Sequence, residues 1–236
     1  MKKLLLVSLM VFLTSIVYAQ DLDLPEEEGA SLESGELLIE ITSSPFGRDG
    51  VTAFESSNTV ILNFGQFRAR YVLNEQLVPR LGIWFSVDDN RSGLSSPDEV
   101  VTVTEMMFTP GIEYHFINQN GFTSYVALDA LISHRSILLE SATDSDVAGL
   151  SFIPSSNNVS ASLGDRGFLG FGAYVAAGAD YHFSSRFYIG AEIGFQAMTG
   201  TTQDVEVDGT VIQEGFTFFD AGVNTMNSFR IGFKLL

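Results

Sequence analysis

The sequence predicts an all-β fold, an eight-stranded antiparallel up-and-down transmembrane β-barrel. Three observations support this prediction. Apolar and polar side chains alternate with a period of two in eight segments. No segment after the N-terminus contains the roughly 18 apolar residues that a membrane-spanning helix requires. The connections between the segments alternate between short turns and long polar loops, and the 236-residue chain is long enough for one such barrel.

The N-terminus has the pattern of a cleaved export signal. Lys2 and Lys3 precede an apolar stretch that ends at Ala19, a small residue of the kind after which signal peptidase cuts. We therefore expect residues 1–19 to be a signal peptide and Gln20 to begin the mature chain. Loss of the two lysines takes the net charge from −17 to −19. A nucleic-acid partner is not expected, because so acidic a chain repels phosphates.

Residues 20–35 (QDLDLPEEEGASLESG) are acidic and show no periodicity, so they are expected to form a disordered periplasmic leader. Docking of a basic periplasmic partner is the alternative role for this leader. The barrel is expected to occupy residues 36–236. The chain contains no Cys, which excludes disulfides, a thiol nucleophile and thiolate metal sites.

Eight alternating segments divide the barrel region, and each is long enough to cross a bilayer, for which about 9–11 tilted residues suffice. Their expected ranges are 36–44, 60–73, 77–87, 101–116, 122–133, 168–183, 187–199 and 220–236. In the sixth segment, for example, Tyr181 and Phe183 fall on one face, and Asp180 and His182 fall on the other. The apolar face is expected to contact outer-membrane lipid.

The connections fall into two classes by length. The tight turns are 74–76, 117–121 and 184–186, and the long polar loops are 45–59, 88–100, 134–167 and 200–219. Short turns on one side and long loops on the other are typical of outer-membrane barrels, whose turns face the periplasm. We therefore expect a Gram-negative outer-membrane protein with both termini in the periplasm.

Two segments end in a repeated pattern, since 111–116 and 178–183 both read Gly-x-acid-Tyr-His-Phe. Aromatic rings near the turns are expected to form a girdle at the lipid headgroup level. The expected girdle residues are Tyr71, Tyr114, Phe116, Tyr181, Phe183 and Phe187. His115 and His182 of the repeat lie on strands that are not neighbours and have no third strong ligand nearby. We therefore predict no metal site and no cofactor.

With these features the chain resembles the small eight-stranded outer-membrane β-barrels of the OmpA/OmpX type, particularly the barrel-domain proteins of Bacteroidetes. The resemblance covers residues 36–236 and includes the C-terminal sequence SFRIGFKLL. That ending is similar to the assembly signal read by the barrel-insertion machinery, although it closes on Leu-Leu where a terminal aromatic is usual. The corresponding residues are Phe229, Ile231, Gly232, Phe233 and Leu235. The resemblance implies a fold and a location, but no activity, because the family has many functions.

The polar faces of the strands carry a nearly balanced set of charges that is expected to fill the lumen. The acids are Glu36, Glu40, Glu113, Asp129, Asp180 and Glu192, and the bases are Arg68, Arg70, Arg80, Arg230 and Lys234. Trp84, Tyr125 and Tyr174 add bulk to the same face. The interior of an eight-stranded barrel is only just wide enough for side chains, so a plugged, structural lumen is expected. A narrow path through these charges, in a small channel or passive transporter, is the alternative.

An enzymatic alternative depends on His134, Ser136 and Glu140, which could act as base, nucleophile and orienting acid at the mouth of the long 134–167 loop. The His-x-Ser order is similar to that of outer-membrane lipid A deacylases, but the residues after the serine do not match that family. We therefore expect no enzyme, and a lipid-modifying barrel remains a remote alternative.

The 134–167 loop is the longest connection and is unusually apolar for an exterior loop. It contains Leu138, Leu139, Leu150, Phe152 and Ile153. Such residues predict either packing over the barrel mouth or contact with a partner. The leading functional hypothesis is therefore a structural or interaction role through the extracellular loops, with a larger outer-membrane complex as the partner of this loop.

Overall fold

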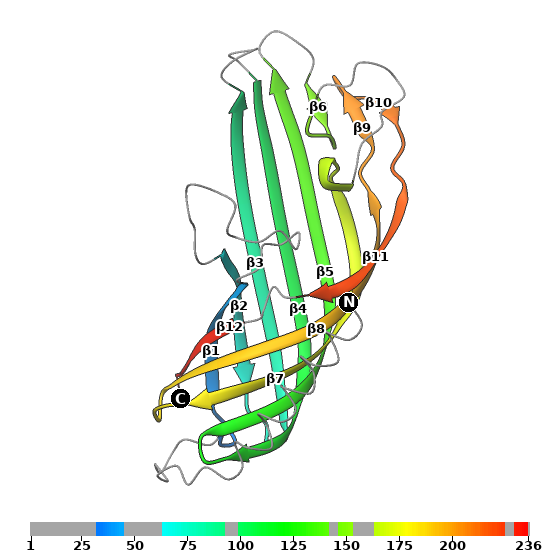
Figure 1. The fold of residues 1–236 in the computed structure, drawn as a ribbon. Coiled ribbons are helices and arrows are strands. Elements are labelled where there is room, and N and C mark those ends of the chain that lie inside the picture. Colours follow the sequence, from blue (N-terminus) through cyan, green and yellow to red (C-terminus); the bar gives the residue numbers. More distant parts are fainter. Residues whose placement is uncertain are drawn as a thin grey trace, which may run out of the picture.

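The structure is a computed structural model that describes residues 32–44, 63–92, 99–141, 146–152, 163–224 and 229–235. Within these ranges the chain is almost entirely β-structure (Figure 1). The one helical element among them is a short 3-10 turn, η1 (Leu163–Asp165). None of the described residues belongs to a helix that is long and apolar enough to span a membrane.

The long strands form a closed antiparallel barrel in chain order. They are β1 (Leu37–Ser44), β2 (Asn63–Tyr71), β3 (Leu77–Ser92), β4 (Glu99–Gln119), β5 (Phe122–Ser141), β7 (Phe168–His182), β8 (Phe187–Thr202), β11 (Thr217–Asn224) and β12 (Phe229–Lys234). Both β11 and β12 pair with β8 and together form the eighth strand. Pairing of β12 with β1, from Leu38↔Lys234 to Ser43↔Phe229, closes the barrel. The predicted eight-stranded up-and-down barrel is confirmed.

Two strands extend well beyond their predicted ends, because β3 continues past residue 87 to Ser92 and β5 continues past residue 133 to Ser141. The β3–β4 ladder is unbroken from Leu77↔Tyr114 to Ser92↔Glu99. The prediction of a long loop over residues 88–100 is therefore wrong, and only residues 93–98 lie outside the described strands. Alternation weakens there because both faces become polar, while the backbone hydrogen bonds continue.

The turn between β4 and β5 is tighter than the predicted 117–121. Only Asn120 (φ 54°) and Gly121 (φ 73°) separate the two strands. Positive φ at both central residues is the geometry of a type I′ turn, which fits the twist of an antiparallel pair and favours Asn-Gly. The same geometry recurs at Asp208 (φ 49°) and Gly209 (φ 73°) in a second hairpin that the sequence analysis missed.

That second hairpin belongs to a small sheet beyond the barrel, which we call the upper sheet. It consists of β6 (Val147–Ala148), β9 (Val205–Val207) and β10 (Thr210–Gln213), added in the order β5-β6-β9-β10 to the end of β5 (Figure 1). Its buried core is formed by Leu139, Val147, Leu150 and Val205. Leu139 and Leu150, two of the five apolar residues singled out in the 134–167 loop, thus pack in this local core. Leu138 and Phe152 are exposed, and Ile153 lies outside the described residues.

The wall of the barrel has unequal height. β2 pairs with β3 only from Phe67↔Ile83 to Arg70↔Arg80, whereas β3 remains paired with β4 up to Ser92. The barrel is therefore closed at the end with the short turns, and its β3–β4–β5 side rises far above β1 and β2 (Figure 1).

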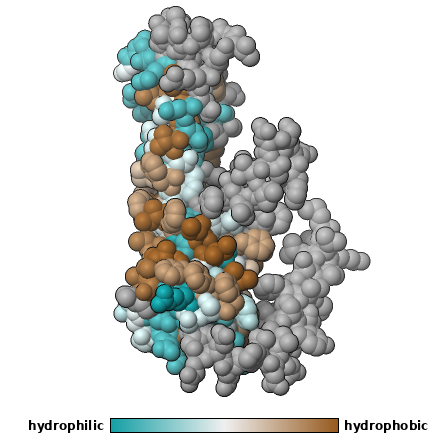
Figure 2. All heavy atoms as spheres, turned by 90° about the vertical axis from the view of Figure 1, so that its left-hand side faces the viewer, coloured by the Kyte–Doolittle hydropathy of each residue, from teal (hydrophilic) through white to brown (hydrophobic). Residues whose placement is uncertain are grey.

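The outer surface is apolar and the interior is polar, which inverts the usual arrangement of a soluble protein. Phe67, Phe85, Ile231 and Val223 are each more than 60% exposed, and many further outward residues of the strands are also exposed and apolar. Figure 2 shows a belt of apolar residues around the lower part of one face, with hydrophilic residues above and below it. A contiguous exposed surface of this kind requires an apolar environment.

The end of the leader is ordered against the barrel. Leu32 is only 2% exposed and packs with Leu38, Val72, Val78 and Tyr188. The sequence predicted a disordered leader through residue 35, and for residues 32–35 that prediction is wrong, because the lumen offers them apolar contacts and backbone partners. Residues 1–31, with the expected signal peptide, lie outside the described residues.

Candidate functional site

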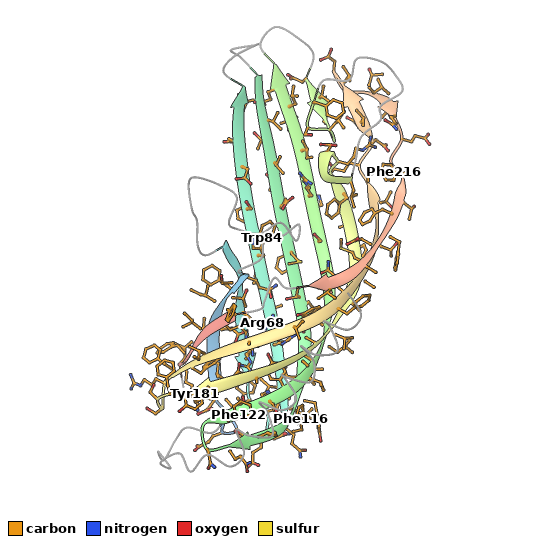
Figure 3. All side chains as sticks on the ribbon, in the orientation of Figure 1. Arg68, Trp84, Phe116, Phe122, Tyr181 and Phe216 are labelled. Carbon is orange, nitrogen blue, oxygen red and sulfur yellow. The ribbon has the colours of Figure 1, made fainter. Side chains whose placement is uncertain are left out.

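The candidate site is the lumen, where a layer of charged side chains crosses the barrel. Each of the eight strands contributes at least one charged residue to this layer, and none of these residues is more than 4% exposed. They are Glu40, Arg68, Arg70, Arg80, Glu113, Asp129, Asp180, Glu192 and Arg230. Arg68 lies inside the lower barrel in Figure 3. The alternation along each strand brings all nine of these expected lumen residues inside.

Glu192 on β8 is the centre of the layer. Its Oε2 accepts hydrogen bonds from Arg80 Nη1 (2.7 Å), Arg230 Nη1 (3.1 Å), Arg68 Nη1 (3.4 Å) and Tyr125 Oη (2.7 Å). These donors come from four other strands on several sides of the lumen. One carboxylate on β8 therefore connects residues of four other strands across the lumen.

Glu113 separates two arginines that the strand register places directly opposite each other. Arg70 and Arg80 are cross-strand partners on β2 and β3, so their charges repel. Glu113 accepts from Arg70 Nη2 (2.5 Å) with one oxygen and from Arg80 Nη1 (3.0 Å) with the other. Arg70 also donates to Asp180 (2.9 Å). The Glu113 carboxylate thus offsets the repulsion between these two arginines.

Two ion pairs reach across an intervening strand because that strand has a glycine between them. Gly111 on β4 lies opposite both Arg80 and Asp129, and these two side chains form a bidentate pair with distances of 2.7 and 2.6 Å. A Cβ atom at Gly111 would collide with the Asp129 carboxylate. Gly190 on β8 similarly lies between Asp180 and Arg230, which are also hydrogen bonded.

The repeated Gly-x-acid-Tyr-His-Phe pattern builds two similar histidine–tyrosine contacts. His115 faces Tyr125 and His182 faces Tyr188, with ring centroids 5.0 and 4.9 Å apart and the same interplanar angle of 31°. Each tyrosine hydroxyl donates to a carboxylate, Tyr125 to Glu192 (2.7 Å) and Tyr188 to Glu40 (2.8 Å). Among the described residues, no His, Asp and Glu group has the geometry of a metal site.

Tyr188 is a bulky lumen residue that the sequence analysis did not single out. It is fully buried and faces Gly232 of β12, where a Cβ atom would collide with the tyrosine ring. The pattern that could have identified Tyr188 is a bulky inward residue opposite a glycine on the neighbouring strand. Tyr125 is accommodated in the same way by its partner Gly178, and the ring of Tyr174 lies against Gly194, two residues from its cross-strand partner Gln196.

The remaining lumen charges lie apart from the central layer. Lys234 Nζ donates to Glu36 Oε1 (2.9 Å) at the end with the short turns, where Glu36 is partly exposed. Trp84 faces the lumen above the layer and is partly exposed. Most of the charged lumen residues therefore lie in the lower half of the barrel.

The expected girdle residues all lie on the outer surface close to the short turns. Tyr71, Tyr114, Phe116, Tyr181, Phe183 and Phe187 are each at least 40% exposed. Phe116 and Tyr181 are at this end of the barrel in Figure 3. The expected assembly residues Phe229, Ile231 and Leu235 are also exposed outside, and Phe233 is partly exposed and packs against Phe187 (5.5 Å).

The residues of the enzymatic alternative are not in a loop. His134, Ser136 and Glu140 belong to β5, which continues to Ser141 because it pairs with β4 along that length. They share one face by strand alternation. Glu140 lies four residues beyond Ser136, roughly 13 Å along a strand with a rise of about 3.3 Å per residue. A hydrogen-bonded triad would require shorter spacing than this strand provides.

Comparisons with known proteins find similar solved structures but no family. No family model matches the sequence, and no curated protein is significantly similar to it. Among solved structures, the chain is similar to the N-terminal β-barrel domain of OprF from Pseudomonas aeruginosa (15% identity, TM-score 0.39, 86% of this chain and 100% of that chain covered). It is also similar to the outer membrane protein OprG from the same species (10%, 0.43, 87% and 98%). A third similar structure is Ail, the attachment invasion locus protein of Yersinia pestis (14%, 0.39, 86% and 99%).

Proposed function

We propose that this chain is a Gram-negative outer-membrane β-barrel with a plugged lumen, which acts as a structural or interaction protein through its extracellular part. The observation that supports this proposal most directly is the inverted polarity, with buried ion pairs inside and exposed apolar residues outside. Exposure of apolar surface to water costs roughly 25 cal/mol per Å². Lipid chains remove this cost, and a closed barrel satisfies its backbone groups internally.

The aromatic residues near the short turns support a membrane interface at that end, and the short turns themselves support its periplasmic side. Amphipathic rings are favoured at the headgroup level, so Tyr71, Tyr114 and Tyr181 would anchor the barrel at the inner face of the membrane. The export signal and the C-terminal segment that ends in Leu235 fit secretion followed by insertion through the barrel-assembly machinery. Both termini would then be periplasmic.

The charged layer supports a closed lumen. Its members cross from wall to wall, and the central carboxylate of Glu192 contacts three arginines. Refolded protein in a planar bilayer should therefore show no steady single-channel conductance, while a heat-dependent gel shift verifies that it is folded. Steady conductance of the folded protein would overturn the plugged-lumen proposal in favour of a small channel or passive transporter.

The part of the protein above the apolar belt supports an interaction role. β5 has 20 residues, about twice the number needed to cross a bilayer, and it carries the upper sheet. Leu138, Ala148, Glu206 and Val211 lie in one cross-strand row on the outer face of that sheet, and Leu138 and Val211 are exposed.

Site-specific photo-crosslinking in the native membrane tests this role. A photoreactive residue at Val211 should give a discrete protein adduct, whereas the same residue at Phe195, in the apolar belt, should not give that adduct. Both positions are exposed in the isolated chain, which makes them a matched pair. The same adduct from both positions, or none from Val211, would contradict a partner at the upper sheet.

A further inference from the structure

The end of the barrel with the short turns has a closure that is separate from the charged layer. Residues 32–35, which we call the strap, precede β1 and fold back onto the opening. Leu32 is buried among Leu38, Val72, Val78 and Tyr188, and the first three of these lie on β1, on the segment after β2, and on β3. An apolar cluster therefore fills the opening below the ion pairs, and one of its members, Leu32, comes from the end of the leader.

The strap is held by specific polar contacts on both sides of the opening. Leu32 N donates to Asn118 Oδ1 (3.0 Å), and Asn118 Nδ2 donates back to Leu32 O (3.0 Å). This reciprocal pair reproduces the hydrogen bonds of a strand partner on β4. At the other end of the strap, Gly35 N donates to Val72 O (2.8 Å), and Ser34 Oγ donates to Leu73 O (2.8 Å).

The local sequence turns the chain back over the lumen. Gly35 has a φ of +94°, a conformation that glycine adopts without steric cost. Glu33 N donates to Glu36 Oε2 (3.0 Å), which tightens the turn before β1. These contacts aim Leu32 inward, while Glu33 and Ser34 stay exposed.

We infer that Leu32 is a stopper that seals the short-turn end of the lumen, and that Asn118 is the latch that holds it there. Release of the strap would uncover Val72, Val78 and the ring of Tyr188. Tyr188 also donates to Glu40 of the charged layer, so the stopper contacts a residue of the plug itself. The strap is thus an intramolecular lid on one end of the barrel. This inference holds for either orientation of the barrel in a membrane.

The absence of cysteine from the chain allows a direct accessibility test. A single Val78→Cys substitution places a thiol beneath the stopper, and its reaction rate with a charged, water-soluble thiol reagent is measured on the folded protein. The rate should be low with the native strap and should rise at least tenfold when Leu32→Ser and Asn118→Ala are added. A Ser185→Cys variant in the exposed turn between β7 and β8 should react at the same rate with and without the strap substitutions.

Two further measurements separate the stopper from a general effect on folding. Glu33→Ala alters an exposed strap residue and should leave the Val78→Cys rate unchanged. In Asn118→Ala without any cysteine, amide exchange at Leu32 should accelerate at least tenfold while the β1–β12 ladder stays protected. A Val78→Cys rate that does not respond to the strap substitutions, or a native Leu32 amide that exchanges as fast as that of Asn118→Ala, would overturn the inference.

Discussion

Replacement of Glu192 by glutamine is the most informative perturbation of the lumen. The substitution keeps the shape of the side chain and removes its charge. Glu192 is 3% exposed and accepts from Arg68, Arg80, Arg230 and Tyr125 within 3.5 Å. In Glu192→Gln the side-chain NH2 group would point toward arginine N–H groups, which are also hydrogen-bond donors. The three arginines would in addition lose a shared counter-ion.

The contacts that remain set the expected magnitude. Loss of one partner from a buried ion pair costs about 3–5 kcal/mol. Arg68 keeps Glu40 (3.0 Å), and Arg80 keeps its bidentate contact with Asp129, so no arginine is left without a carboxylate. We therefore expect Glu192→Gln to lower the free energy of unfolding by about 3 kcal/mol, at the lower end of that range.

Glu36→Gln is the matched control because it makes the same chemical change at the rim. Glu36 pairs with Lys234 at 2.9 Å and is partly exposed. Fully exposed pairs contribute about 0–1 kcal/mol and are screened by salt, and this rim pair lies between that case and the central layer because the Lys234 side chain is only 5% exposed. The cost of Glu36→Gln should therefore be about 1 kcal/mol, below that of Glu192→Gln, and should shrink in about 1 M salt, whereas the cost of Glu192→Gln should persist.

Urea unfolding in lipid vesicles measures both costs, with the fluorescence of Trp84, the single tryptophan, as the signal. The heat-dependent gel shift provides a second measure of the folded fraction. A Glu192→Gln protein within about 0.5 kcal/mol of Glu36→Gln would refute the argument that the lumen network is a tightly coupled, buried structure.

The remaining predictions concern packing at other places in the fold. Gly111→Ala should cost about 1–3 kcal/mol in the same unfolding assay because the new methyl group would meet the Asp129 carboxylate, whereas Gly222→Ala, which meets nothing within 4 Å, should be nearly neutral. Equal unfolding costs for the two variants would argue against the need for glycine between Arg80 and Asp129. Leu150→Ala should destabilise the upper sheet by about 2–5 kcal/mol, because Leu150 is fully buried in the core of that sheet. Limited proteolysis should then cleave the upper sheet of Leu150→Ala faster, while the gel shift of the barrel is unchanged. As a control, Val211→Ala should be cleaved at the same rate as the parent chain.

The lumen residues were predictable because strand geometry makes side-chain direction a local property. Successive residues point to opposite faces, so Glu40, Arg68 and Glu113 face inward once their strands are identified. The type I′ turn at Asn120-Gly121 is equally local. The Asp208-Gly209 turn carried the same signal, between two short alternating segments, and could have been found in the same way.

The partners within the lumen were not predictable from alternation. Alternation specifies the face of a strand but not the height at which its residue meets another strand, and this height depends on the stagger of the whole barrel. The contact between Glu192 and Arg68 joins residues on strands that are far apart in sequence and are not hydrogen-bonded neighbours. The reach of Arg80 to Asp129 further depends on the glycine that happens to lie between them.

The sequence by itself determined that this chain alternates, where it turns, and that its charges face one way and its apolar residues the other, because these are properties of neighbouring residues. Only the tertiary structure decided the upper extent of β3 and β5, where the alternation fades and interstrand hydrogen bonds alone maintain the strands. It also decided the burial of Leu32, whose leader has no periodicity of its own. Leu32 is ordered because the closed barrel offers it an apolar opening and an amide partner in Asn118.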